Sequence, residues 1–242
     1  MKKLLAALVL SAVPALGLAS ETLPLEKANI DLHDKASLQR GAGHFVNYCI
    51  GCHSLKYMRY NRMAADLGID DKTLRETLIR GDAKPGDQMT NPMRPEDGIA
   101  WFGVAVPDLT LETRVRTPDW VYTYLKSFYV DPTRPWGVNN VIFPNVGMPH
   151  ILSNLQGLQE PVMAQHEGAA TPVVEGVKLV KAGSLSPEEY DAMVRDITNF
   201  LTYVGEPMQL ERQRLGVFVL IFLGLFFIAA YALKKEFWKD VH

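Results

Sequence analysis

Two cysteines and a histidine stand together in NYCIGCHSLKY, the stretch Asn47–Tyr57 of a 242-residue chain. Cys49 and Cys52 are the only cysteines in the chain, and His53 follows directly. Three chemistries use a cysteine pair at this spacing: a redox dithiol, half of a zinc site, and covalent haem attachment, whose recognised signature is C-x-x-C-H. The remainder of the sequence has to decide among them.

Zinc and thiol exchange are the less favoured alternatives. A structural zinc site takes about four ligands, and this chain has no second cysteine pair. The other histidines considered as ligands are scattered without ligand spacing: His33, His44, His150 and His166. A dithiol oxidoreductase places its C-x-x-C at the start of a helix in a βαβ setting, whereas no β-rich pattern precedes Cys49 in SLQRGAGHFVNY.

Covalent haem attachment suits the pattern directly. Residues i and i+3 of a helical turn lie on the same side, so the thiols of Cys49 and Cys52 can both form thioethers with one haem. His53 can then serve as the proximal iron ligand. The sequence therefore favours a c-type haem at this stretch.

The occupant of the sixth iron position indicates the function. An open position would suggest ligand binding, whereas a methionine sulfur would suggest electron transfer, because methionine–histidine ligation raises the reduction potential. Met148 stands in NVGMPH, between Gly147 and Pro149, in a rigid, irregular loop that could present a sulfur atom. Spacing alone leaves three rivals for this role: Met89, Met93 and Met163.

The N-terminus has the pattern of a secretory signal peptide. Lys2 and Lys3 are followed by an apolar run that closes with the small residues Gly17 and Ala19, as a cleavage site requires. We expect cleavage after Ala19, with an uncleaved anchor as the alternative. Residues 1–19 are therefore left out of the fold.

A second apolar run, from Leu215 to Leu233, has 19 residues and no charge. As a helix it spans about 28 Å, close to the thickness of a bilayer core. We expect an exported domain over 20–210, a transmembrane anchor with its flanks over 211–235, and a cytoplasmic tail over 236–242.

The net charge of the exported domain argues against one class of partner, nucleic acid, and excludes little else. Residues 20–214 hold 20 basic and 25 acidic side chains. A mildly acidic exported domain argues against nucleic-acid binding and is compatible with a basic protein partner, although solubility alone also explains it.

The exported domain is expected to be mainly α, with a few helices joined by long loops. Helical patterns cover 39–57 and 71–80, begin at Thr117-Pro118, and begin again at the capping box that starts at Ser186. Residues 81–116 and 131–185 show little periodicity and no convincing run of alternating strands. Loops of this length suit a domain that wraps a large flat cofactor.

The stretch CIGCHSLKYMRYNRMAADLGI resembles the haem-binding segment of the cytochrome c1 family, haem subunits of the quinol–cytochrome c oxidoreductase (respiratory complex III). The blocks SLQRGAGHFVNY, VPDLTLETRVR, NVGMPHIL and DITNFLTYVGEPMQLERQRLG also match, and together with the anchor they cover most of residues 36–235. The resemblance implies a mainly α, cytochrome c-like haem domain with long loop insertions and one C-terminal transmembrane helix.

The resemblance also implies the roles of individual residues. One haem c would be covalently attached through Cys49 and Cys52, with His53 as proximal and Met148 as distal iron ligand.

The resemblance implies further haem contacts. Arg114 matches an arginine that pairs with a haem propionate, and Pro107 matches a proline packed near the haem. Trp120 stands where an aromatic contact often lies, although it is equally suited to the core. The segment EDGIAWFGVA departs from the family pattern, so haem contacts within residues 96–106 stay open.

By the same resemblance, the chain would pass single electrons from a Rieske iron–sulfur subunit to a c-type cytochrome, beside a cytochrome b subunit. It would have no catalytic side chains of its own and would act as part of the oxidoreductase complex. It would cross the bacterial inner membrane once, with the haem domain on the periplasmic side and the C-terminus in the cytoplasm. The alternatives are another membrane-anchored monohaem electron-transfer cytochrome and an exported thiol oxidoreductase.

Overall fold

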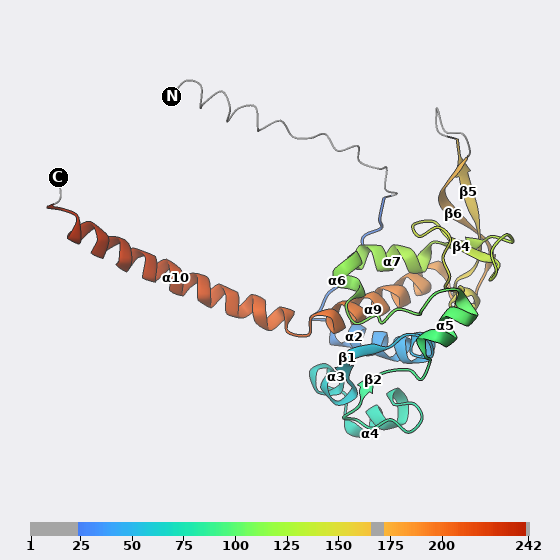
Figure 1. Cartoon of the computed structure of the whole chain (residues 1–242), viewed down its shortest axis with the longest axis horizontal. Helices are drawn as coiled ribbons and strands as arrows, with labels where there is room; N and C mark the ends of the chain where they lie inside the picture. The colour runs from blue at the N-terminus through green and yellow to red at the C-terminus, as the bar shows by residue number, and fades with distance from the viewer. Residues whose placement is uncertain (1–23, 166–171, 241–242) are drawn as a thin grey trace.

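The residues that the structure describes form a helical head and one long helix (Figure 1). The computed structural model describes residues 24–165 and 172–240. The predicted signal peptide, residues 1–19, lies outside the described residues. The long helix α10 (Gln209–Phe237) leads away from the head, as Figure 1 shows. The predicted mainly α architecture with a C-terminal apolar helix is confirmed.

The core forms where α2 (Lys35–His44) crosses α9 (Pro187–Gly205). A Cβ atom at Gly41 would lie 2.1 Å from the carbonyl oxygen of Asp196, so only glycine permits this close crossing. Beside it, the Arg40 guanidinium donates two hydrogen bonds, of 2.6 and 2.9 Å, to the Asp196 carboxylate. This crossing holds the segment that leads into the cysteine pair.

Both helix starts that the sequence predicts most clearly are confirmed. The Ser186 hydroxyl accepts from the Glu189 N–H, and the Glu189 carboxylate accepts from the Ser186 N–H, which completes the capping box of α9. At α7 (Pro118–Lys126), the Thr117 side chain accepts from the Trp120 N–H, with proline at the first helical position.

The helix predicted over residues 39–57 ends early. After α2 the chain widens into a π-helical turn, η1 (Phe45–Cys49), and residues 55–57 belong to the strand β1 (Leu55–Arg59). This strand pairs with β2 (Gln88–Met89). The sequence prediction was wrong here because the pairing partner lies about thirty residues further along the chain.

The predicted helix over residues 71–80 is shorter and irregular. It consists of α4 (Asp71–Thr73) and a second π-helical turn, η2 (Leu74–Leu78), after which Ile79 is extended. Between the cysteine segment and this helix lies α3 (Tyr60–Leu67), which ends at the left-handed Gly68.

The two long segments expected to be loops hold short elements. The first contains α5 (Pro95–Phe102) and α6 (Glu112–Arg116). Strand β3 (Phe128–Val130) pairs with β4 (Val138–Asn140), and the short helix α8 (Ser153–Gln156) follows.

A long hairpin was not expected from the sequence. Strand β5 (Gly157–Ala164) pairs with β6 (Val173–Ala182) in antiparallel register, with two irregularities, and the hairpin extends from the head in Figure 1. The irregular register and the mostly exposed side chains of both strands explain why no clean alternation of apolar and polar residues marks them.

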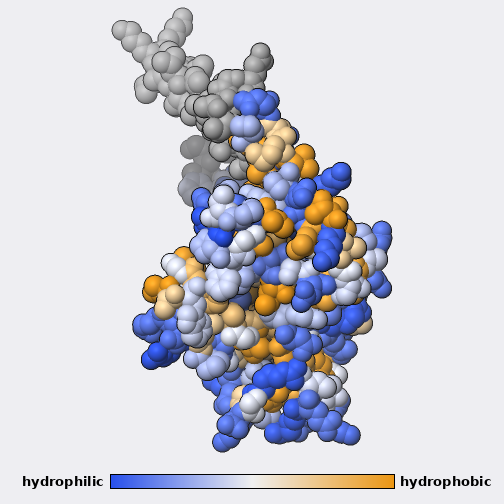
Figure 2. Space-filling view, turned by 90° about the vertical axis from the view of Figure 1, so that its right-hand side faces the viewer, coloured by the Kyte–Doolittle hydropathy of each residue, from blue (hydrophilic) through white to orange (hydrophobic). Residues whose placement is uncertain are grey.

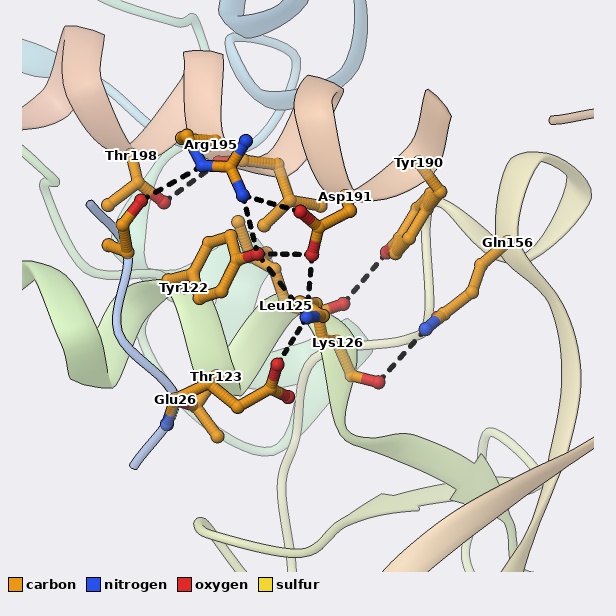
Figure 3. Close-up of polar contacts among 12 residues, drawn as sticks. Glu26, Tyr122, Thr123, Leu125, Lys126, Gln156, Tyr190, Asp191, Arg195 and Thr198 are labelled. Atoms are coloured by element: carbon orange, nitrogen blue, oxygen red, sulfur yellow. Dashed lines mark hydrogen bonds and ion pairs between the residues drawn. The ribbon is translucent and has the colours of Figure 1, made fainter. Parts of the chain in front are cut away.

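A polar network fastens the N-terminal segment to the head (Figure 3). The Lys126 ammonium on α7 contacts the carboxylates of both Glu26 and Asp191, and Asp191 also pairs with Arg195 on α9 at 2.6 Å. Burial opposes the charge on Lys126, but the two carboxylates outweigh it and raise the pKa of Lys126 above its ordinary value. The network therefore joins three segments that are far apart in the sequence.

The surface of the head differs from the surface of α10. On the face shown in Figure 2, apolar side chains form patches between hydrophilic ones. Helix α10 contains the whole predicted apolar run, and none of its membrane-length window is buried against the head. At about 1.5 Å per residue its 29 residues extend for about 43 Å, enough to cross a bilayer core.

Candidate haem-binding site

One turn brings the C-x-x-C-H residues together. The turn η1 ends at Cys49, and the N–H groups of Cys52 and His53 both donate to the Cys49 carbonyl oxygen, at 3.0 and 2.8 Å. Both thiols are free. The backbone turn therefore brings the three side chains together, as the sequence predicts. All three line a single pocket.

The pocket has an almost wholly apolar lining, and residues from three separate segments contribute to it. The turn after η1 forms one wall, the end of α5 and the following segment form a second, and the loop around Met148 forms a third. The lining residues are Tyr48, Cys49, Cys52, His53, Phe102, Val104, Val106, Pro107, Gly147, Met148, Pro149 and Ile151.

The imidazole of His53 is held by the backbone. Its Nδ1 lies 2.8 Å from the carbonyl oxygen of Pro107, and because a carbonyl can only accept, Nδ1 carries the proton. That tautomer leaves Nε2 as the atom able to bind a metal. Burial lowers the pKa of His53, although the hydrogen bond to Pro107 opposes the effect. The ring is therefore neutral near pH 7, which is the form that ligates.

Backbone contacts fix the segment that carries Pro107. The Leu109 N–H donates to the Ser54 carbonyl at 2.9 Å, next to His53 in the chain. The Asp108 carboxylate accepts from the N–H groups of Lys56, at 2.8 Å, and Thr110, at 3.0 Å. The motif VPDLT therefore clamps residues 107–110 against residues 54–57 and sets the position of the histidine's acceptor.

The environment of the thiols does not suit thiol exchange. Burial, with a smaller effect from Cys52, raises the pKa of Cys49 to about 12, and burial also raises the pKa of Cys52. The nucleophile in thiol exchange is the thiolate, and catalytic cysteines have lowered pKa values. In the described ranges, no group of three or more His, Cys, Asp or Glu side chains is placed to hold a metal ion.

The loop that presents Met148 is organised by a buried asparagine. The Asn140 side-chain oxygen accepts from the N–H groups of Ile142, at 3.1 Å, and Phe143, at 3.2 Å, while its amide donates to the Tyr124 carbonyl at 2.8 Å. Asn140 is fully buried, so these bonds replace the water it has lost. The loop is thereby anchored to α7.

Gly147 lets the same loop approach the opposite wall. A Cβ atom at this position would lie 3.0 Å from the Phe102 carbonyl oxygen and 3.1 Å from the Val104 side chain. The glycine thus closes the pocket between the Met148 loop and the segment after α5. Residues 96–106, whose contacts the sequence leaves open, supply Phe102, Val104 and Val106 to the lining.

Among the methionines of the described residues, Met148 alone lines the pocket. Met89 is completely buried in β2, and Met163 is 52% exposed on the hairpin. Met148 is also contacted by Tyr124, whose hydroxyl lies 3.4 Å from the sulfur. Burial raises the pKa of Tyr124 far above its ordinary value.

Tyr124 did not stand out in the sequence. It is stacked on Trp120 with a centroid distance of 5.0 Å and an interplanar angle of 10°. Their spacing of four residues places both rings on one face of a helix, which was the available signal. Trp120 thus supports Tyr124 and is not itself one of the residues that line the pocket.

Arg114 lies away from the pocket lining. Its guanidinium pairs with the Glu206 carboxylate at 3.1 Å, near the start of α10, and its side chain is 55% exposed. Arg116, two residues later, lies over the Trp120 ring at 4.5 Å and pairs with Glu112 at 3.1 Å. Pro107, in contrast, lines the pocket.

The residues of the pocket fit a covalently bound haem c. Two thiols spaced for two thioethers, an imidazole with a free Nε2 and a thioether sulfur surround one apolar space. A methionine–histidine pair is the axial set of electron-transfer c-type cytochromes. Cys49, Cys52 and His53 would hold the group from one wall, and Met148 from another.

Comparison with known proteins gives a consistent result. The model of the Cytochrome C1 family matches residues 26–241. Cytochrome c1 of Allochromatium vinosum is 65% identical over 244 residues, covering 100% of both chains. Cytochrome c1 of Rhodospirillum rubrum is 27% identical over 231 residues, covering 86% of this chain and 83% of the relative.

A relative with a different name is also similar. The ammonia monooxygenase gamma subunit of Nitrosomonas europaea is 42% identical over 224 residues, covering 93% of this chain and 92% of the relative. The family match extends over the cysteine turn, the Met148 loop and α10 alike. The chain therefore belongs to the cytochrome c1 family of electron-transfer haem proteins.

Proposed function

We propose that this chain passes single electrons from a Rieske iron–sulfur protein to a c-type cytochrome, as the haem subunit of a quinol–cytochrome c oxidoreductase. Cytochrome c1 is the electron-carrier subunit of the bc1 complex. The observation that carries the proposal is the pocket in which the Cys49–His53 turn and the Met148 loop come together.

Haem c, when bound, supplies a one-electron carrier. The thiols of Cys49 and Cys52 would tether it, and the Nε2 atom of His53 and the sulfur of Met148 would be its iron ligands. The apolar lining excludes water and disfavours the more highly charged oxidised state, which raises the potential, as methionine ligation also does. No side chain of this chain has to act as an acid, base or nucleophile.

The anchor supports membrane assembly beside a cytochrome b subunit. Helix α10 is long and apolar enough to cross a bilayer once. The proposed orientation, with the head in the periplasm and the C-terminus in the cytoplasm of a bacterium, follows from the signal-peptide pattern of residues 1–19. Residues 234–239 include three lysines, but Arg212 and Arg214 stand at the other end of the helix, so the proposed orientation rests on the signal-peptide pattern and not on the positive-inside rule.

Pro107 and Arg114, like the proposed ligands, have roles that are predictions. Pro107 is proposed to contact the haem and to hold His53 through its carbonyl group. For Arg114, the propionate role that the resemblance implies competes with its pairing to Glu206. A propionate contact predicts that Arg114→Ala changes the haem potential, whereas a wild-type potential would assign Arg114 to the Glu206 contact alone.

Replacement of Met148 tests the proposed ligand set. Met148→Ala should leave the haem covalently bound, because the thioethers remain. It should lower the equilibrium constant for haem reduction by more than about tenfold, because methionine ligation raises the potential. A tenfold change corresponds to a potential shift of about 59 mV for one electron. Redox titration of the purified membrane protein measures this shift.

Met163→Ala is the matched control, since Met163 is exposed on the hairpin. It should titrate like the wild type. A wild-type potential in Met148→Ala would reject Met148 as the ligand. A reduced protein without a c-type α-band would reject haem altogether and would favour the thiol oxidoreductase.

A further inference from the structure

A tyrosine hydroxyl contacts the sulfur that is proposed to bind iron. The Tyr124 oxygen lies 3.4 Å from the Met148 sulfur, within range for an O–H donor and a sulfur acceptor. Met148 lines the pocket, whereas Tyr124 approaches its sulfur from α7. The contact therefore joins the pocket wall to the core of the head.

Aromatic neighbours hold the Tyr124 ring. Trp120 stacks on it, and Phe128 packs edge-on with a centroid distance of 5.1 Å and an angle of 70°. Phe143 packs edge-on against both Tyr124 and Trp120. Arg116 then covers the outer side of Trp120. The side chain cannot swing to another rotamer without displacing this cluster, so its hydroxyl stays beside the sulfur.

A backbone contact fixes the same two elements relative to each other. The Tyr124 carbonyl accepts from the side-chain amide of Asn140, which organises the Met148 loop. Tyr124 thus connects helix α7 to the loop through both its backbone carbonyl and its side-chain hydroxyl. This double attachment distinguishes the hydroxyl–sulfur contact from a chance approach of two surface groups.

The chemistry of the thioether gives the contact a consequence. Its sulfur has two lone pairs, so it can ligate iron with one and accept a hydrogen bond with the other. A hydrogen bond withdraws electron density from the sulfur and makes it a weaker donor to the oxidised iron, which needs donation most. Hydrogen bonding to a ligand is one of the means by which a protein tunes a haem potential.

We propose that Tyr124 is a positioning residue that holds the Met148 sulfur and raises the reduction potential of the haem. The proposal rests on the proposed function, because it requires Met148 to be the distal ligand. It adds a determinant of potential outside the pocket lining, supported by Trp120 and Phe143.

Tyr124→Phe tests this role, since it removes the hydroxyl and keeps the ring. In the detergent-purified complex, the reduction equilibrium constant should fall about two- to tenfold, with tenfold corresponding to about 59 mV for one electron. The sulfur-to-iron charge-transfer band should remain, because the ligand is retained.

Tyr122→Phe is the control. Tyr122 lies on the same helix, and its hydroxyl contacts Asp191 on α9, away from Met148. Removing that hydroxyl should leave the haem potential at the wild-type value. An equal shift in both variants would overturn the proposal, because it would mark a general response to losing a hydroxyl on α7.

Comparison with Met148→Ala separates a failure of the Tyr124 role from a failure of the proposed function. If Met148→Ala lowers the potential and Tyr124→Phe does not, the role of Tyr124 is overturned and the proposed function stands. If Met148→Ala has the wild-type potential, the ligand assignment fails, and the role of Tyr124 fails with it.

Discussion

At the scale of residues, the proposed iron ligands depend on backbone groups outside the C-x-x-C-H motif. The Pro107 carbonyl selects the tautomer of His53, and Asp108 secures the segment that carries that carbonyl. On the other side, Asn140 shapes the loop of Met148. The motif supplies the chemistry, and these contacts supply the orientation.

Asp108→Ala tests the support of His53. It removes two acceptor contacts to the N–H groups of Lys56 and Thr110, so we expect the free energy of unfolding to fall by about 1–2 kcal/mol. We also expect the haem potential to shift as the Pro107 carbonyl moves. Denaturant unfolding and redox titration measure the two effects.

Asp108→Asn is the conservative comparison for that test. It retains one acceptor oxygen and should therefore lose less stability than Asp108→Ala. Wild-type stability and potential in the alanine variant would show that the Pro107 segment is held without Asp108.

Residue types and spacing were sufficient to predict the clustering of Cys49, Cys52 and His53, because the three lie within one turn of chain. Tyr124 and Asn140 could not be identified in this way. Their roles arise from contacts between α7 and a loop some sixteen to twenty-four residues away, and nothing local in the sequence encodes those contacts. The predicted haem contact of Arg114 rested on resemblance, and in the structure its side chain pairs with Glu206.

At the scale of elements, the crossing of α2 and α9 positions the haem segment. Gly41 allows the backbones to touch, and α2 continues directly into the turn η1 that carries Cys49. The capped starts of α7 and α9 were predictable because their signals are local. The hairpin of β5 and β6 was not, because strand pairing depends on partners distant in sequence and its side chains are mostly exposed.

Gly41→Ala tests the crossing. The added methyl group would lie 2.1 Å from the Asp196 carbonyl oxygen, so the helices must separate. We expect the free energy of unfolding to fall by about 3 kcal/mol or more, near the upper end for overpacked cores. Thermal unfolding of the haem-loaded protein in detergent measures the loss.

Gly43→Ala provides the matched control on the same helix, because a Cβ atom at this position would meet nothing within 4 Å beyond its own stretch of helix. It should be neutral or stabilise by up to about 1 kcal/mol, as alanine favours helices over glycine. Equal stability of the two variants would contradict a close helix crossing at Gly41.

At the scale of the whole molecule, the described residues form a head built around the candidate haem pocket and attached to one membrane-length helix. Glu206 joins the two parts, since its carboxylate pairs with Arg114 of the head and with Arg212 of α10, the latter at 2.6 Å. The apolar surface of α10 is exposed along its membrane window. Such an apolar surface requires lipid or partner helices to cover it.

The composition of the complex purified from membranes in mild detergent tests whether this chain is the haem subunit of a quinol–cytochrome c oxidoreductase. We predict that this chain co-purifies with a cytochrome b subunit and a Rieske iron–sulfur subunit, and that the reduced sample shows a c-type α-band from haem bound covalently to this chain. Purification of the chain without cytochrome b and the Rieske subunit, or a sample without the c-type band, would contradict the account.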